Sequence, residues 1–177
     1  RAIEPLNLAN DKLTDDLGEA ITAHVKDIKE NGSAEDIAKT TAVLDRLGDE
    51  QAGASSAAAA LRAEQLLIVD IDDALAKGNL TPPAKGNAYS LVSEALKTNK
   101  ISKSNSEPRV KALSAGLLKL ANAAFDAENA EDTNKYTALI KRLNVDREGL
   151  NELNAKVKAR QASAAAVAVA TAAVASR

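Results

Sequence analysis

Apolar side chains recur every three or four residues along most of this chain. The recurrence is found in at least five segments between about residues 10 and 160, and Gly, Asn, Pro or polar runs separate them. This spacing places side chains on one face of an α-helix. No run of alternating apolar and polar residues with hairpin turns competes with it. The sequence therefore predicts an all-α fold, a helical bundle of five to seven helices.

The boundaries of several helices are marked by local signals. A stripe that runs from Leu13 to Ile28 ends at Asn31-Gly32, a typical helix stop. Ser33 and Asp36 then form a variant of the capping box, with Asp in place of Glu. Thr81-Pro82 is expected to start a later helix, with Thr as N-cap and Pro at the first helical position. The most regular seam, at alternating steps of three and four, comprises Val110, Leu113, Leu117, Leu120 and Ala124.

The pattern divides the chain into three parts. Residues 1–9 have no period and contain Pro5, so we expect an extended lead-in. Residues 10–160 form the helical bundle. Residues 161–177 form an Ala-rich C-terminal helix that either completes the core or mediates assembly. No repeat at a fixed period is evident from the sequence, and a solenoid is not expected. Residues 48–56, rich in Gly and Ser, either break a helix or form a weak point in a long one.

The chain lacks, or has only one of, several residue types that catalytic sites commonly use. The chain has no Cys, Met or Trp, one Phe and one His, whereas 38 of its 177 residues are Ala. The single histidine, His24, lies beside an apolar stripe, and no Gly-x-Ser-x-Gly sequence is present for a nucleophile. Asp70, Asp72 and Asp73 lack the spacing of a calcium loop, and we interpret them as a solvated face. We expect no enzymatic activity, no metal and no cofactor.

Charge is distributed unevenly although the net charge is only −2. Residues 11–50 hold eleven acids and five bases, whereas residues 97–119 hold six bases and one acid. Two interpretations stay open: the two surfaces meet within one bundle, or they join copies of the chain head to tail. The basic stretch has no interleaved aromatic residues on which bases could stack, so nucleic-acid binding is not expected.

The C-terminal segment is uncharged and built from small residues. Residues 162–176 comprise nine Ala, three Val, two Ser and one Thr. A helix of this length spans about 22 Å, which is short of the roughly 30 Å of a hydrocarbon core, so a membrane span is not expected. Small side chains allow helices to approach closely. The segment belongs to the monomer's core, joins neighbouring copies or forms a frayed tail. The candidate assembly residues are Ala164, Val167, Val169 and Val174.

Two features are typical of exported proteins. The chain starts at Arg1, which a processed precursor or a trimmed chain would explain, and it has no sulfur-containing residues. Asn31 and Asn79 begin glycosylation sequons at expected helix junctions. We therefore expect a secreted or cell-surface protein.

These observations favour a non-enzymatic structural or surface protein that self-associates through helix packing, as a filament, coat or matrix does. A homo-oligomer or polymer is then the expected state. The alternative is a secreted helical binding protein for an apolar ligand or for another protein. The low number of large apolar and aromatic side chains argues against a lipid pocket.

Overall fold

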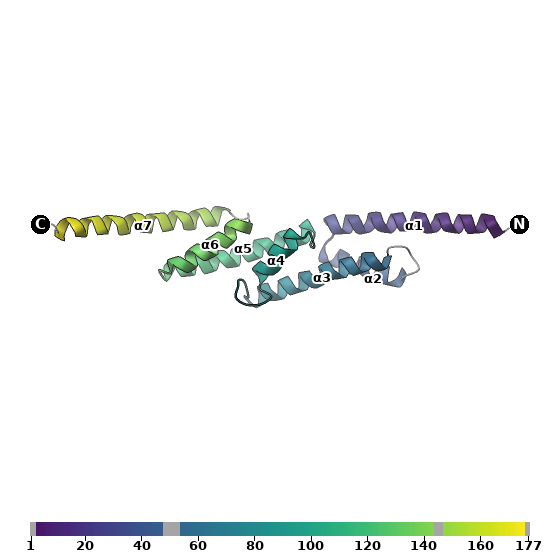
Figure 1. The fold of residues 1–177 in the computed structure, drawn as a ribbon, viewed down its shortest axis with the longest axis horizontal. Coiled ribbons are helices and arrows are strands. Elements are labelled where there is room, and N and C mark those ends of the chain that lie inside the picture. Colours follow the sequence, from purple (N-terminus) through teal and green to yellow (C-terminus); the bar gives the residue numbers. More distant parts are fainter. Residues whose placement is uncertain (1–2, 48–53, 144–146, 176–177) are drawn as a thin grey trace. The chain divides into compact units, whose positions relative to one another are not determined.

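A computed structural model describes the backbone of residues 3–47, 54–143 and 147–175, and the side chains of residues 12–47, 56–143, 149–168 and 171. Within these residues the chain forms helices and no strand (Figure 1), which confirms the all-α prediction. The helices are α1 (Ile3–Asn31), α2 (Ala34–Leu47), α3 (Ala54–Ala76), α4 (Ala88–Lys97), α5 (Lys103–Asp126), α6 (Ala130–Leu143) and α7 (Arg147–Ala175).

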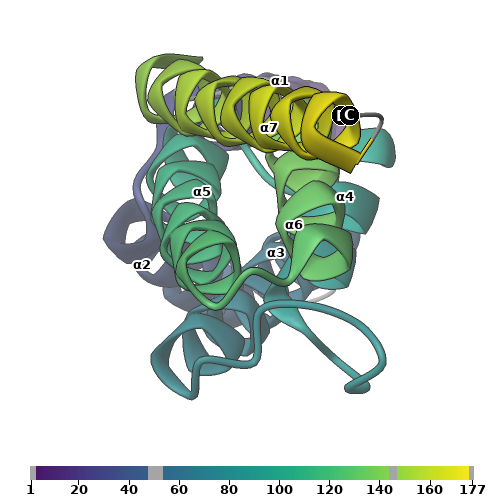
Figure 2. The same ribbon diagram turned by 90° about the vertical axis from the view of Figure 1, so that its left-hand side faces the viewer.

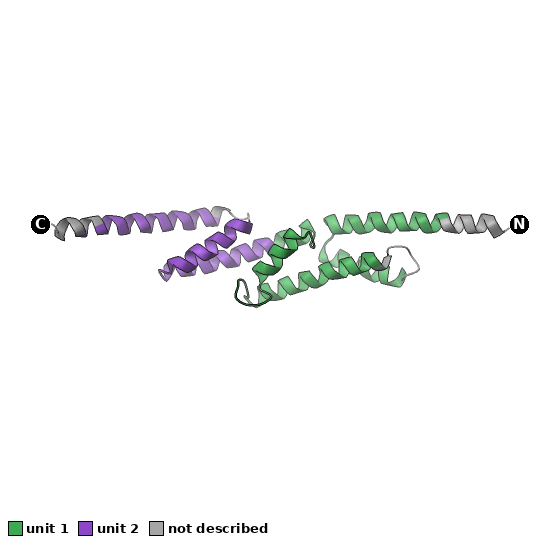
Figure 3. Cartoon of the chain, viewed as in Figure 1, with its two compact units in different colours: residues 1–109 green, residues 110–177 purple. Residues whose placement is uncertain are grey.

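The chain divides into two units (Figure 3). Unit 1, residues 1–109, contains α1 to α4 and the first turns of α5, and α3 packs against α1, α2 and α4. Unit 2, residues 110–177, contains the rest of α5 together with α6 and α7. Figure 2 shows α7 above α5 and α6. The largest fully buried side chains are aliphatic, namely Ile37, Leu61 and Ile71 in unit 1 and Leu113, Leu117, Ile140 and Leu153 in unit 2.

Two helix starts differ from the sequence-based predictions. The segment expected to be an extended lead-in is helical from Ile3. Pro5 lies in the first turn of α1, where a backbone N–H has no helical partner to lose. Thr81-Pro82 does not start a helix either: Asn87 caps α4, and its side chain accepts a hydrogen bond from the Ser90 N–H at 2.9 Å. Pro82 precedes another proline, which disfavours the helical conformation. Of the suspected weak point at residues 48–56, residues 48–53 lie outside the described residues.

In the part of the chain that the structure describes, three helices are followed by a residue with a left-handed backbone conformation. Gly78 follows α3 with φ +67°, Asn99 follows α4 with φ 51°, and Glu128 follows α5 with φ 59°. The N–H groups that follow them reach back into the last turn; for example, the Asn129 N–H donates to the Ala124 carbonyl at 2.9 Å. Gly adopts this conformation without a steric penalty and Asn tolerates it, whereas Glu does not.

Replacing Glu128 with Gly is therefore expected to raise the free energy of unfolding by about 0.5–1 kcal/mol, because the steric penalty at positive φ is removed. Urea unfolding followed by circular dichroism measures the change. The matched control is Glu131→Gly in the first turn of α6, which is expected to lower stability by about the same amount. A lower stability for the Glu128 variant would contradict the prediction.

The two units contain related helices, which the sequence analysis did not detect. α2 and α6 are both 14 residues long. When each residue of α2 is paired with the α6 residue whose number is higher by 96, eight of the 14 pairs are identical. The identical pairs are Ala34/Ala130, Glu35/Glu131, Asp36/Asp132, Lys39/Lys135, Thr41/Thr137, Ala42/Ala138, Arg46/Arg142 and Leu47/Leu143.

The structure of the two helices follows the same correspondence. The buried positions of α6, Thr133, Thr137 and Ile140, match buried positions of α2 at an offset of 96. Ser33 caps α2 and Asn129 caps α6, each exchanging hydrogen bonds with the Asp three residues later. The preceding helices agree as well, because Leu17, Ile21 and Val25 of α1 correspond to three buried residues of α5, Leu113, Leu117 and Ala121. Each unit therefore contains a copy of one helical hairpin followed by a long helix.

Candidate functional site

The repeat places two equivalent sites beside the turn that joins its first two helices. In unit 1 this site is a cluster of polar groups, formed by Gly32, Glu64, Ser102, Ser104 and Asn105 and called here the unit 1 cluster. In unit 2 it is an open pocket of about 360 Å³, called here the unit 2 pocket, and it is lined by Phe125, Glu128, Ala130, Thr133, Asn134, Val157, Arg160, Gln161 and Ala164.

The unit 1 cluster holds the start of α5 against α3 and the α1–α2 turn. Asn105 is buried, and its side-chain Nδ2 donates to the Gly32 carbonyl at 3.0 Å and to Glu64 Oε1 at 3.4 Å. The Ser102 N–H donates to the same Glu64 oxygen at 2.7 Å. Ser104 Oγ also donates to the Gly32 carbonyl, at 2.8 Å. The buried Glu64 side chain is thus used to bind the segment that enters α5.

A second contact between α3 and α5 lies two turns further along α3. Arg109 on α5 donates through one guanidinium nitrogen to Asp72 on α3 at 2.5 Å and through the other to the Asn105 carbonyl at 2.7 Å. The Arg109 side chain is only 13% exposed. Charged and polar groups therefore fix the start of α5 on α3 at two levels.

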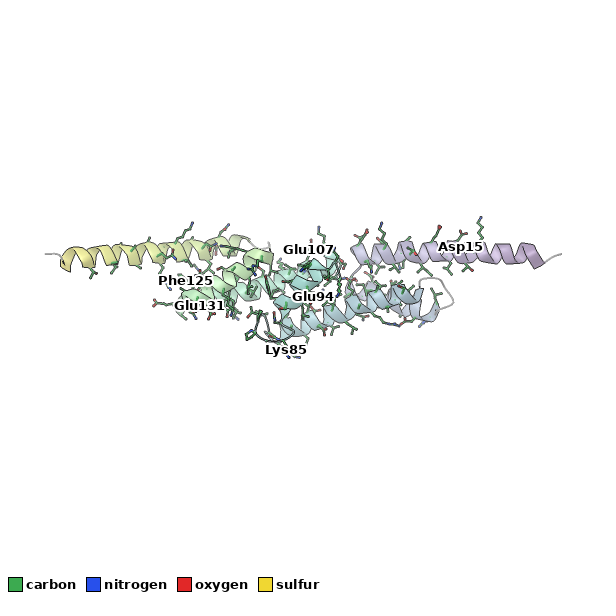
Figure 4. The ribbon with its side chains drawn as sticks, in the orientation of Figure 1. Asp15, Lys85, Glu94, Glu107, Phe125 and Glu131 are labelled. Atoms are coloured by element: carbon green, nitrogen blue, oxygen red, sulfur yellow. The ribbon has the colours of Figure 1, made fainter. Side chains whose placement is uncertain are left out.

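The unit 2 pocket is formed by the end of α5, the start of α6 and the middle of α7. The Arg160 guanidinium lies over the Phe125 ring, 3.8 Å from its centroid, and donates to the Phe125 carbonyl at 2.5 Å. Figure 4 labels Phe125 near the end of α5 and Glu131 on α6. Val157, Ala164 and the Phe125 ring supply apolar surface, and Glu128, Asn134 and Gln161 supply polar groups. Stacking of Arg160 on the ring stabilises one wall of the pocket.

The two sites correspond residue by residue at the offset of 96. Gly32 corresponds to Glu128, Glu64 to Arg160, and the buried residues Leu61 and Ile68 to Val157 and Ala164. In unit 1 the site is filled by residues 102–105. In the described part of unit 2 no segment fills the equivalent place.

The structure places two of the four candidate assembly residues on the solvent-facing part of α7. Ala164 is exposed and lines the unit 2 pocket, and Val167 is 63% exposed. Val169 and Val174 lie outside the residues whose side chains are described. Phe125 and Arg160 were not predicted as site residues, and they meet although they are 35 residues apart. The only signal was that Phe125 is the chain's single Phe.

The two sequon asparagines differ in accessibility. Asn31 is exposed at the end of α1, and its Nδ2 donates to Asp27 Oδ1 at 2.8 Å. Asn79 is half-buried in the loop after α3, and its Nδ2 lies 3.4 Å from the Lys85 carbonyl oxygen. Asn31 is thus the more accessible of the two, and glycosylation at either position stays a prediction.

The other polar candidates make ordinary surface contacts. His24 is exposed, with Nε2 3.4 Å from Thr40 Oγ1. Asp73 forms an ion pair with Lys77, which directly follows α3. Among the described residues no three His, Cys, Asp or Glu side chains are grouped closely enough to bind a metal ion. Within the same residues, no helix has the length and apolar character needed to cross a membrane.

Comparison with known proteins adds no relative to these observations. No protein-family model, no curated protein and no solved structure matches the chain.

Proposed function

We propose that this chain is a non-enzymatic structural or surface protein that self-associates through helix packing, as a filament, coat or matrix protein does. The main supporting observation is the surface of α7. Every described side chain from residue 158 to residue 168 is exposed, and none after Arg160 carries a charge. Figure 1 shows the C-terminal half of α7 extending past the ends of α5 and α6.

An uncharged helix of small residues gains little from contact with water. Helices that are apolar on all sides are normally surrounded by other protein. Small side chains also allow two backbones to approach closely, so that many weak contacts add up over several turns. A neighbouring copy would supply such a surface to α7.

The proposal includes an exported location. It is supported by the absence of Cys, Met and Trp and by the exposure of Asn31 within its sequon. A glycan at the end of α1 would extend into solvent.

Val167→Glu is expected to dissociate the assembly and leave the helical content unchanged, because it places an unpaired charge in an apolar contact. Light scattering after size-exclusion chromatography gives the mass, and circular dichroism gives the helical content. Val69→Glu on α3 is the matched control, since Val69 is 56% exposed and lies on another helix.

Truncation after Arg160 tests the same contact without adding a charge. It is expected to yield a smaller, helical species. An unchanged oligomeric mass would contradict the proposed role of α7, and loss of all helical structure would instead assign the segment to the monomer's own core.

The unit 2 pocket favours one alternative, a helical binding protein for an apolar ligand. Its volume of about 360 Å³ falls in the range of small-molecule sites, and much of its lining is apolar. Saturable binding of a fluorescent apolar probe by a monomeric protein would support this alternative over self-association.

A further inference from the structure

We propose that the unit 2 pocket and the adjoining face of α7 bind α1 of a second copy of this chain, in a head-to-tail contact that continues the internal repeat. This inference rests on the proposed self-association and specifies its geometry. It assigns the partner, the two surfaces and their register.

The occupant is identified by the repeat. In unit 1 the equivalent site is filled by the segment that enters α5, and α3 also contacts Arg109 there. At the offset of 96, α1 is the counterpart of α5, and Leu13 is the counterpart of Arg109. The chain's own α1 packs against α2 and α3 in unit 1. No described segment of unit 2 fills its pocket, and α1 of a second copy can supply the missing contact.

One pair of positions supports the register directly. In unit 1 Asp72 forms an ion pair with Arg109. At the offset of 96, Asp72 corresponds to Ala168 on α7, and Arg109 corresponds to Leu13 on α1. Both charged residues are thus replaced by apolar ones. Leu13 is 65% exposed and Ala168 is also exposed. Placing Leu13 of one copy against Ala168 of another would bury an apolar pair where unit 1 has an ion pair, and no charge would be left unpaired.

α1 and α7 carry charges of opposite sign near these positions. Residues 153–160 of α7 contain three bases and no acid, namely Lys156, Lys158 and Arg160. Residues 13–25 of α1 contain three acids and no Lys or Arg, and all three are exposed: Asp15, Asp16 and Glu19. Figure 4 labels Asp15 on α1. In the parallel register of unit 1 the bases of α7 precede Ala168 and the acids of α1 follow Leu13, so the two sets do not face each other. Their opposite signs speed the encounter of two copies.

Apolar side chains are exposed on both α1 and α7. Arrays of repeated units end in elements with a polar outer face, which keeps them soluble. Here Leu13 and Leu17 are exposed among the charged residues of α1, and Val167 is exposed on the uncharged part of α7. Since the contact joins two different surfaces, each copy can bind one neighbour at each end, and the assembly grows until a ring closes.

The test restores the unit 1 ion pair across the interface. Leu13→Arg alone and Ala168→Asp alone are each expected to weaken association roughly tenfold or more, because each buries one unpaired charge. The double variant, and an equimolar mixture of the two single variants, are expected to associate again. Sedimentation velocity at several protein concentrations measures the dissociation constants. Leu66→Arg is the matched control, because Leu66 is 67% exposed on α3 and lies outside both surfaces.

The outcomes separate this inference from the proposal on which it rests. A wild-type chain that stays monomeric at all concentrations overturns both, and saturable binding of an apolar probe by that monomer would assign the pocket to a small ligand. A wild-type chain that associates, with both single variants unchanged, overturns the head-to-tail contact and leaves self-association standing. Weakening by the single variants without rescue in the mixture overturns the assigned register.

Discussion

Replacing Leu61 with Ala is expected to lower the free energy of unfolding by about 2–5 kcal/mol. The Leu61 side chain is fully buried, at 0% exposure, on α3, which packs against α1, α2 and α4. Truncation removes buried apolar surface and leaves a cavity that the surrounding helices fill only in part. Urea unfolding monitored by circular dichroism gives the difference from the shift of the midpoint, provided that the slope is unchanged.

The chain offers a matched control on the same helix. Leu66→Ala makes the same chemical change at a position that is 67% exposed, and it is expected to alter stability by no more than about 0.5 kcal/mol. Equal effects at the two positions would show that the assigned inner and outer faces of α3 are wrong.

Replacing Asn105 with Ala is expected to cost about 2–3 kcal/mol, because a charged buried acceptor loses one of its donors. The Asn105 amide also binds the Gly32 carbonyl and Ser102 Oγ, so the start of α5 loses one contact with α3 and one with the α1–α2 turn. The Ser102 N–H and Ser104 Oγ keep theirs. The same unfolding experiment measures the loss. Asn151→Ala, at an exposed position of α7, is expected to change stability by less than about 0.5 kcal/mol.

A second substitution shows whether the loss passes through Glu64. In a Glu64→Leu background the buried carboxylate is absent, so Asn105→Ala is expected to cost less than in the wild-type chain, with a coupling of about 0.5–3 kcal/mol. Strictly additive effects of the two substitutions would contradict the role given to this hydrogen bond.

Local signals were sufficient to predict the helices but not all of their ends. The helix stop at Asn31-Gly32 and the capping box of Ser33 are confirmed: the Asp36 N–H donates to Ser33 Oγ at 3.2 Å, and the Ser33 N–H donates to the Asp36 carboxylate at 3.0 Å. Ser33 Oγ also donates to the Asp36 carboxylate at 2.7 Å, and this bond, together with the one from the Ser33 N–H, lowers the pKa of the exposed Asp36 carboxyl below its ordinary value. The start of α4 was missed because Thr81-Pro82 has the composition of a helix start, whereas Pro83 prevents it.

The candidate site was only partly accessible from the sequence. The absence of charge was enough to single out Ala164 and Val167, because composition alone marks a helix that gains little from water. The pairing of Phe125 with Arg160 depends on how α5 and α7 cross, which no local pattern records. Glu64 lies on the apolar face of α3, but its partners come from segments far away in the chain.

The likeness of α2 and α6 creates a risk of mispairing while the chain folds. The two helices share their capping geometry and most of their surface residues. Each can therefore pack in the place of the other without a change in its own local structure. Two interior positions oppose the exchange. In the place of α2, α6 would insert Tyr136 where Thr40 is only 7% exposed, and it would bring the Thr133 hydroxyl to the fully buried position of Ile37. Overpacking and an apolar cavity around a polar group both raise the free energy of the exchanged state. Side-chain volume at two positions therefore directs each helix to its own hairpin.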